Sequence, residues 1–499
     1  MSMDKKVILT LFVILTFLTA CQKSPVSNAE VGNNGISADI GEIQTEMKSD
    51  DLDNDPETQP NVETTVTENV QTSSKPMQSV QYSDAFSSAD GTVQFTMEID
   101  DEVLDVPMPE VLVAPHFLTA EDARRIAGVL FGEADFYEAE PRFAPIYSKE
   151  DIQEKLARWE PYAGDPSVDA YIQEYSTLQE TAPLENPHTP CQWEFKKESF
   201  YYEVEEDVLK SDISDENDNI RASVKVDGIP YIYDVATRNR SDFKLNNIYA
   251  YPYDGMSPLS IDQQIFQRQL CETDEPDEDT IATIQKKAET MLTQMEMGEW
   301  VVDECYVETV DFSDNLGYVI HVNAVPAFQG VPATRIPQLT SLRNTSEEAS
   351  NYYLSDVHFA FSANGELVDF SLYSPVDVKQ VINESVTVLP MTEIMQIAKN
   401  LFTRTDYYEY DRLKLLDVTQ EKLSCQVSIG HISYGLSRIK VPETDESYYY
   451  VPAVTFYGNI QYTGNETGNV YSIDAPYEWG FPLLSLNAVD GTVVNSANR

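Results

Sequence analysis

Beyond about residue 91, hydrophobic and polar positions follow two different periods. Residues 93–100 alternate between apolar and polar with a period of two, which is typical of a half-buried strand. Further along, apolar residues recur at the spacing of a helix face: Ala123, Ile126, Ala127, Leu130 and Phe131. Thr119 stands three residues before Asp122, where its side chain can cap the first turn. The pattern therefore predicts a strand followed by an amphipathic helix.

The helix pattern recurs later in the chain. Residues 118–138 and 389–409 align without gaps, and the first segment is identical to the second at Leu118, Ile126, Ala127, Leu130, Phe131, Asp135, Tyr137 and Glu138. A fainter third copy has apolar residues at Ile281, Ile284, Ala288, Met291 and Leu292. Core-facing stripes are generic, but the shared tail after the helix favours duplication of one structural unit.

Strand-like runs follow each of these helices, and short turn signals separate several runs elsewhere. Asp227-Gly228, Asn364-Gly365 and Asp490-Gly491 suit the positive φ angles of tight hairpin turns. A second helical block is expected at about 149–180. A helix followed by a meander predicts an α+β fold, in which repeated modules each pack an amphipathic helix on an antiparallel meander sheet.

Composition divides the chain into segments. Residues 21–90 are rich in Ser, Thr, Asn, Asp and Glu and hold few large apolar residues, so we expect a disordered acidic tether there. Residues 91–255 are expected to form an N-terminal α+β domain. Residues 256–499 are expected to form a C-terminal α+β domain with room for two modules. Pro252, Gly255 and Pro258 interrupt the pattern between the two domains.

The first 21 residues resemble the export signal of bacterial lipoproteins. Lys5 and Lys6 precede an apolar run at 7–18 that is too short to span a bilayer, and the run ends in Leu-Thr-Ala-Cys at 18–21. These four residues match the lipobox. The resemblance implies that residues 1–20 are a signal peptide and that Cys21 is the lipid-attachment site. The mature chain would then be held by acyl chains, such as palmitate, on the extracytoplasmic face of the cell membrane.

Charge excludes one class of partner. The chain has 33 Lys and Arg against 84 Asp and Glu, a net charge of −51 at pH 7. Nucleic-acid phosphates would be repelled, so we expect no nucleic-acid partner. The possible partners are the membrane, reached through the N-terminal lipid, and an envelope protein or the cell wall.

The sequence contains no recognisable catalytic, cofactor or metal motif. Its histidines are scattered singly: His116, His188, His321, His358 and His431. None lies in a His-Glu-x-x-His pattern, and no P-loop, Gly-x-Gly-x-x-Gly turn or Gly-x-Ser-x-Gly elbow occurs. His321 and His358 fall in strand-like runs and are expected to be partly buried packing residues. We therefore expect no catalytic, cofactor-binding or metal-binding residues, and no cofactor.

Three other sets of residues allow more than one interpretation. Asp135 with Glu138, and Asp406 with Glu409, recur in the repeat and resemble paired acids, but exposed helix-end residues explain them more simply. The tyrosines at 352–353 and 448–450 suit either a binding face or strand packing. Whether the four cysteines besides Cys21 pair in disulfides stays open: Cys191, Cys271, Cys305 and Cys425.

Two further resemblances concern the body of the chain. An amphipathic helix beside strands joined by Val-Asp-Gly turns is similar to the PepSY modules of bacterial envelope proteins. Residues 130–134 and 434–458 resemble a group of clostridial and other Firmicutes lipoproteins of unknown function. We expect a lipid-anchored binding or regulatory protein rather than an enzyme. The alternatives are a cell-wall or carbohydrate hydrolase that uses paired carboxylates, and a solute-binding receptor for a transporter.

Overall fold

The computed structural model describes residues 63–66, 76–89, 91–139, 148–164, 166–184, 188–199, 216–239, 244–252, 266, 268–311, 316–334, 355–404, 422–441, 447–472 and 480–494. All of them belong to one structural unit that extends from residue 60 to residue 499. None of the helices among these residues is long and apolar enough to cross a membrane.

The described helices and strands are as follows. The helices are α3 (Ala120–Phe131), α4 (Lys149–Trp159), η1 (Glu160–Tyr162, a 3₁₀ helix), α5 (Pro166–Thr181), α7 (Glu278–Gln294) and α8 (Met391–Phe402). The strands of the first half are β1 (Glu63–Val66), β2 (Met77–Ser87), β3 (Val93–Leu104), β4 (Glu110–Pro115), β5 (Phe136–Glu138), β6 (Lys196–Ser199), β7 (Glu216–Val226), β8 (Ile229–Asn239) and β9 (Lys244–Pro252). Those of the second half are β10 (Trp300–Asp311), β11 (Leu316–Phe328), β12 (Val331–Pro332), β13 (Asp356–Ser362), β14 (Leu367–Tyr373), β15 (Val376–Asn383), β16 (Leu423–Lys440), β17 (Tyr448–Gly464), β18 (Val470–Ser472) and β19 (Phe481–Asn487).

Two sheets organise these strands. Sheet A has the order β1-β2-β3-β16-β17-β4-β15, with β18 and β19 paired to β17. Sheet B has the order β10-β11-β13-β14-β9-β8-β7-β5, with β12 paired to β11 and β6 paired to β7. Pairing is antiparallel except between β3 and β16, which run parallel. The predicted α+β class, with helices on antiparallel meander sheets, is confirmed.

Sheet B consists of two similar halves. In chain order, α3 is followed by β5, β7, β8 and β9, and α7 is followed by β10, β11, β13 and β14. The two last strands, β9 and β14, pair antiparallel at the centre of the sheet, and the two first strands lie at its edges. The strand order is therefore the same when read from either edge. This arrangement is what a duplicated helix-and-meander unit produces.

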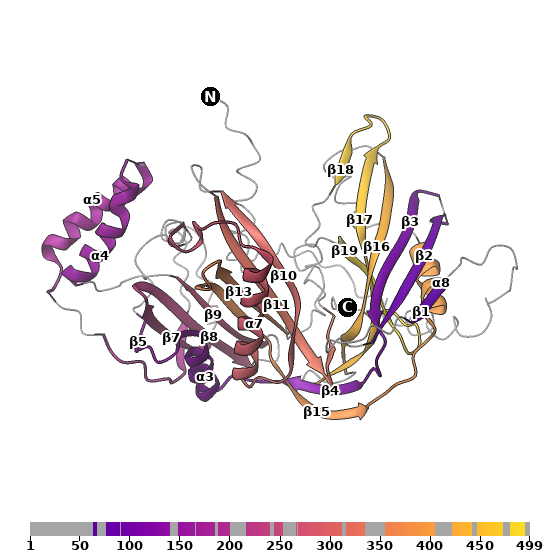
Figure 1. Cartoon of the computed structure of the whole chain (residues 1–499), viewed down its shortest axis with the longest axis horizontal. Coiled ribbons are helices and arrows are strands. Elements are labelled where there is room, and N and C mark those ends of the chain that lie inside the picture. Colours follow the sequence, from indigo (N-terminus) through magenta and orange to yellow (C-terminus); the bar gives the residue numbers. More distant parts are fainter. Residues whose placement is uncertain are drawn as a thin grey trace, which may run out of the picture. The chain divides into compact units, whose positions relative to one another are not determined.

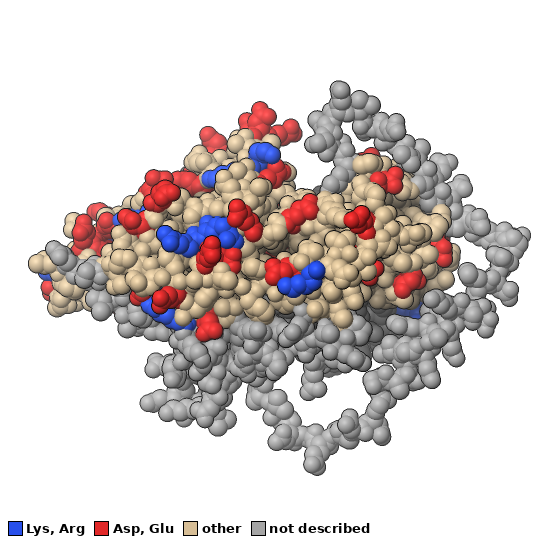
Figure 2. Space-filling view, turned by 90° about the horizontal axis from the view of Figure 1, so that it is seen from below, with Lys and Arg blue, Asp and Glu red and all other residues tan. Residues whose placement is uncertain are grey.

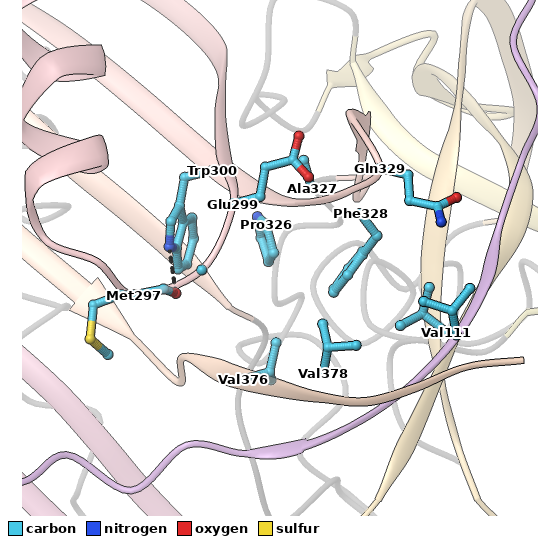
Figure 3. Close-up of a pocket in the computed structure, with 12 residues that line it drawn as sticks. Val111, Met297, Glu299, Trp300, Pro326, Ala327, Phe328, Gln329, Val376 and Val378 are labelled. Atoms are coloured by element: carbon cyan, nitrogen blue, oxygen red, sulfur yellow. Dashed lines mark hydrogen bonds between the residues drawn. The ribbon is translucent and has the colours of Figure 1, made fainter. Parts of the chain in front are cut away.

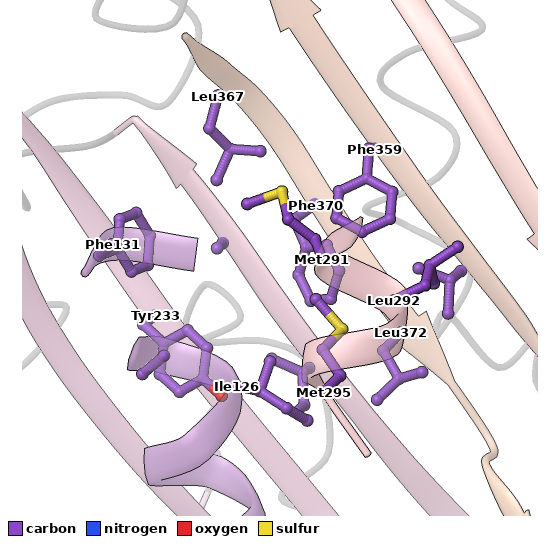
Figure 4. Packing of buried hydrophobic residues seen from close by; sticks show 14 of the residues in the cluster. Ile126, Phe131, Tyr233, Met291, Leu292, Met295, Phe359, Leu367, Phe370 and Leu372 are labelled. Carbon is purple, nitrogen blue, oxygen red and sulfur yellow. The ribbon is translucent and has the colours of Figure 1, made fainter. Parts of the chain in front are cut away.

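Both helices of sheet B pack on the same face (Figure 1). Figure 4 shows Ile126 and Phe131 of α3 and Met291 of α7 meeting residues of the strands below them in one apolar cluster. Thr119 caps α3 as the sequence predicts, because its side chain accepts a hydrogen bond from the backbone N–H of Asp122. The stripes of the first and third repeat copies thus lie against a single core.

The third helix, α8, packs on sheet A. Its buried residues are Ile394, Met395, Ala398 and Phe402, and they join a separate core with β3, β16, β17 and β19. The same stripe therefore covers a different sheet from the one that α3 covers. Residues 405–410, which include Asp406 and Glu409, lie outside the described residues.

Two connections between the sheets run side by side. β4 follows β3 of sheet A and leads to α3 on sheet B, whereas β15 follows β14 of sheet B and returns to sheet A. The two strands pair antiparallel, and β4 also pairs with the start of β17 (Figure 1). A third apolar cluster lies where they meet, with Val111, Val113, Phe328, Tyr448 and Tyr450 among its members.

One predicted boundary is wrong. β2 lies within the segment 21–90, which we expected to be a disordered tether, and it pairs with β3 along its full length. Only one face of β2 is buried, through Val80 and Tyr82, so its composition is nearly as polar as that of a tether. Residues 21–62 lie outside the described residues. The division at 255/256 stays a prediction, and sheet B contains strands from both sides of it.

Candidate functional site

Cys21, the predicted lipid-attachment site, lies outside the described residues. None of the four cysteines whose pairing the sequence left open forms a disulfide in the structure: Cys191, Cys271, Cys305 and Cys425. Cys271 and Cys425 are buried, and burial raises the pKa of the Cys271 thiol to about 12. A thiol with a raised pKa is a poor nucleophile, so Cys271 is suited to packing.

Sheet B carries a row of four titratable side chains on four neighbouring strands. Glu308 Oε2 lies 2.8 Å from His321 Nε2, and His321 Nδ1 lies 2.9 Å from His358 Nε2. His358 Nδ1 then lies 3.4 Å from Asp369 Oδ2. Both histidines are partly buried, as the sequence predicts, but their mutual contact was not foreseen.

This row leaves neither ring a free nitrogen. Each of the four ring nitrogens lies beside another polar group of the row or of the neighbouring ring. The hydrogen bond from His321 lowers the pKa of Glu308, which keeps that carboxylate ionised. A general base or a metal ligand needs an available lone pair. Among the described residues, no group of three or more His, Cys, Asp or Glu side chains is placed to hold a metal ion.

Of the recurring acids, Asp135 and Glu138 are described, and they lie at the surface after α3. Glu138 accepts a hydrogen bond from Lys196 at 2.7 Å, and Asp135 is exposed. A glycosidase acid needs a raised pKa. Four described carboxyl groups have a clearly shifted pKa, and hydrogen bonds to the ionised form lower it in each, against the effect of burial: Asp84, Asp122, Asp277 and Glu308.

Two of the three tyrosines at 448–450 are packing residues, and Tyr449 is half-buried. Tyr448 and Tyr450 are both 2% exposed and belong to the apolar cluster beside β4. The ring centroid of Tyr450 lies 4.6 Å from that of Phe328, so the two rings pack against each other. The tyrosines at 352–353 lie outside the described residues.

An apolar cavity next to this cluster is the strongest candidate for a site. Its volume is about 210 Å³. Figure 3 shows Trp300 and Phe328 on one side and Val111, Val376 and Val378 on the other. The rest of its lining is Met297, Gly298, Glu299, Pro326, Ala327, Gln329 and Val381. Only Glu299 and Gln329 bring polar side chains, so the cavity is built for an apolar group. We call these twelve residues the β15 pocket.

A bulge in β15 aligns its valines with the pocket. Val378 pairs with Val113 and Gln380 with Leu112, so Lys379 is an extra residue between them. The extra residue changes the period-two alternation, and Val381 then pairs with Val111. All three valines of β15 therefore line the pocket: Val376, Val378 and Val381. Val378 lines the pocket and is nevertheless 52% exposed to solvent.

Backbone turns hold the other wall. Phe328 and Val331 are joined by Gln329 and Gly330, with φ angles of 53° and 76°. Positive φ at both positions is typical of a type I′ hairpin turn. Glu296, just before Met297, and Ser374, just before β15, also have positive φ. Such conformations cost free energy in residues other than glycine and often occur at functional sites.

A hydrogen-bonded network anchors β15 to the start of α3. His116 Nδ1 lies 2.8 Å from Asp377 on β15, and its Nε2 lies 3.2 Å from Asp122. Asp122 also binds Thr119 and Arg125. Although burial favours the neutral acid, hydrogen bonds from Thr119, Arg125 and His116 hold the pKa of Asp122 at about 2. The network thus fixes the strand that forms one wall of the pocket.

Replacing Asp122 by asparagine is expected to lower the free energy of unfolding by about 2 kcal/mol near neutral pH. Because the folded-state pKa is depressed, the ionised group stabilises the fold above about pH 4, and this contribution disappears as the pH falls towards about 2. Urea unfolding of D122N and wild type should therefore converge in acid. Glu121→Gln, an exposed acid in the same turn, is the control and should change stability by under about 0.5 kcal/mol. Equal effects of the two substitutions would show that the network is not stabilising.

The pocket could not be found from the sequence. Val111, Trp300, Phe328 and Val378 are far apart in the chain. The pairing of β4 with β15 brings Val111 near Val378, and the pairing of β10 with β11 supplies the wall that holds Trp300 and Phe328. The only local signal was weak: a run of valines at 376, 378 and 381 that fits neither a helix nor a regular strand.

Comparisons with known proteins add little to this description. No protein-family model matches the chain, and no curated protein matches it. Among solved structures, it is similar to an uncharacterised protein from Eubacterium rectale ATCC 33656, at 12% identity over 81% of this chain and 91% of that one, with a TM-score of 0.31. A likeness this weak assigns neither fold nor function.

Proposed function

We propose that this chain is a lipid-anchored extracytoplasmic protein of the bacterial envelope that binds a protein partner through the β15 pocket. One observation carries the proposal: an apolar cavity lies open beside aliphatic side chains that remain exposed on a sheet edge. Val378, Val381 and Ile382 are 52%, 38% and 43% exposed. Exposed apolar residues that adjoin an apolar cavity are typical of a binding surface.

The volume of the pocket favours a protein side chain as its occupant. Sites for drug-sized ligands usually measure about 300–1,000 Å³, whereas an apolar cavity of about 150 Å³ accepts a benzene molecule. The β15 pocket, at about 210 Å³, lies near the lower value. It suits one leucine-sized or phenylalanine-sized side chain that projects from a larger partner. This supports recognition of a protein over uptake of a free solute.

The lining supports binding over catalysis. Trp300 directs its indole N–H to the backbone oxygen of Met297 at 3.1 Å, so that donor is already used within the protein. Glu299 and Gln329 are exposed at the rim. No nucleophile with a base beside it lines this pocket. The location is inferred from the lipobox-like residues 18–21, which would place the folded part on a tether outside the membrane.

Replacing Val378 by aspartate is expected to weaken partner binding. A linear peptide library displayed on phage would be selected on the purified mature chain, and the enriched peptides would be titrated against wild type and V378D. Affinity should fall at least about tenfold, because a charge replaces an apolar contact. Val470→Asp is the matched control, since Val470 is another exposed valine on a short strand of sheet A, and it should bind like wild type. Peptides that bind V378D as well as wild type would refute the proposed site.

A further inference from the structure

The outer side of β15 is an open sheet edge. In the part of the chain that the structure describes, β15 ends the strand order of sheet A and has β4 as its strand partner on one side. Backbone N–H and C=O groups on the other side of an edge strand can pair with an added strand. From Val378 to Asn383 every residue of β15 is exposed. The edge is therefore accessible along most of its length.

The edge is only partly protected against pairing. Proteins usually protect such edges with lysines and bulges. β15 has one lysine, Lys379, and its register shifts twice, at Lys379 and at Ile382. These irregularities limit regular pairing to a few residues. They do not remove the apolar side chains, since Val378, Val381 and Ile382 stay exposed. An edge of this kind suits a short added strand and resists open-ended aggregation.

An added strand would lie beside the pocket. Val376, Val378 and Val381 line the cavity from β15, and Trp300 and Phe328 close it from the other side (Figure 3). Side chains of a strand alternate between its two faces, so every second residue of an added strand would point to the face that holds the cavity. Backbone pairing and side-chain insertion can therefore occur together.

Charge indicates what kind of segment fits. Two exposed acids lie near the open edge: Glu384 directly after β15 and Glu299 at the pocket rim. Asp377 of β15 is already bound to His116. Lys379 is the basic residue within β15. Figure 2 views the side on which β4 and β15 lie in Figure 1, and it shows a broad uncharged area with acidic residues and several basic residues scattered over it. With a net charge of −51, the chain would attract a basic partner.

We infer that the partner contributes an extended basic segment, which adds to the outer edge of β15 as a further strand and places one apolar side chain in the β15 pocket. This inference rests on the function proposed above and names its partner by chemistry. The segment has apolar residues at alternate positions, with lysine or arginine between them. Main-chain hydrogen bonds supply affinity in this mode, and the pocket supplies selectivity.

The test uses capped synthetic octapeptides in which lysine alternates with valine or leucine, titrated against the full mature chain by fluorescence anisotropy. One variant replaces every lysine by glutamate. Two others carry N-methyl groups on the odd or on the even residues, so that each blocks one edge of the peptide. Strand addition predicts that one methylated form loses at least about tenfold in affinity and that the other binds almost normally. The glutamate form should also bind at least about tenfold more weakly.

Charge variants of the protein give an independent readout. Lys379→Gln should strengthen binding of the lysine peptide about 2–5-fold, and Glu384→Gln should weaken it by a similar factor, both less so at high salt. Lys422→Gln, at an exposed lysine before β16, is the control for the loss of one positive charge and should have no such effect.

Each outcome separates this inference from the proposed function. Equal binding of both methylated forms, with loss in V378D, would overturn strand addition and leave the pocket as a binding site. Equal binding of the glutamate form would overturn the basic partner. If no octapeptide binds while library-selected peptides of another kind depend on Val378, the inference fails and the proposed function stands. If V378D binds the octapeptides and the library-selected peptides as well as wild type does, the inference and the proposed function are both overturned.

Discussion

Replacement of Cys21 by serine is expected to abolish incorporation of radiolabelled palmitate into the protein. The attachment seen in lipoproteins is a thioether, and sulfur forms it because a thiolate is a far stronger nucleophile than a serine hydroxyl. Labelled cells that express wild type or C21S would be compared by immunoprecipitation. The intact mass of wild type should also correspond to a chain that begins at residue 21 and carries acyl groups. The effect is all or none, because the predicted lipid site is a single residue.

The control for this experiment is Cys191→Ser. Cys191 is a free, partly buried thiol in the folded region, so its replacement should leave the label unchanged. Label that persists in C21S would place the acyl groups elsewhere. A wild-type chain that keeps residues 1–20 and carries no label would refute lipid anchoring and leave the apolar run at 7–18 as the membrane contact. Neither result would alter the fold or the β15 pocket.

Helices were predictable from the sequence because their signal is local. The stripes of α3, α7 and α8 are set by residues three and four positions apart, and each stripe faces a core as expected. The Asp227-Gly228 turn was predictable for the same reason, and both residues have positive φ. Helices of copies one and three cover sheet B, and the helix of copy two covers sheet A, so a common origin of copies one and two stays a prediction.

Strand partners were not predictable, because they depend on distant segments. Nothing near β9 indicates that it pairs with β14, more than a hundred residues later, and nothing near β3 indicates its parallel pairing with β16. β2 was missed because a strand with one solvent-facing side has the composition of a polar linker. The β15 pocket and the contact between His321 and His358 share this origin, since each joins side chains from separate strands.

Replacement of Gly458 by alanine is expected to destabilise the protein severely. Gly458 lies within β17 between Ile429 of β16 and Phe481 of β19. A Cβ built there would lie 2.2 Å from the backbone oxygen of Ser428 and 2.9 Å from Cα of Ile429. Both are backbone atoms of the adjacent strand, so no rotamer change can relieve the overlap. The strands would have to move apart along a long ladder, and the free energy of unfolding should fall by about 3 kcal/mol or more.

The same substitution at Gly128 should have the opposite sign, which makes it a strict control. Gly128 is exposed within α3, and a Cβ built there meets no atom within 4 Å. Alanine is a better helix former than glycine, so G128A should gain about 0.5–1 kcal/mol. Urea unfolding of both variants measures the difference. If G458A loses less than about 1 kcal/mol, β16 and β17 do not approach as closely as described. In that case the parallel pairing of β16 with β3 would also need revision, because it depends on the same stretch of β16.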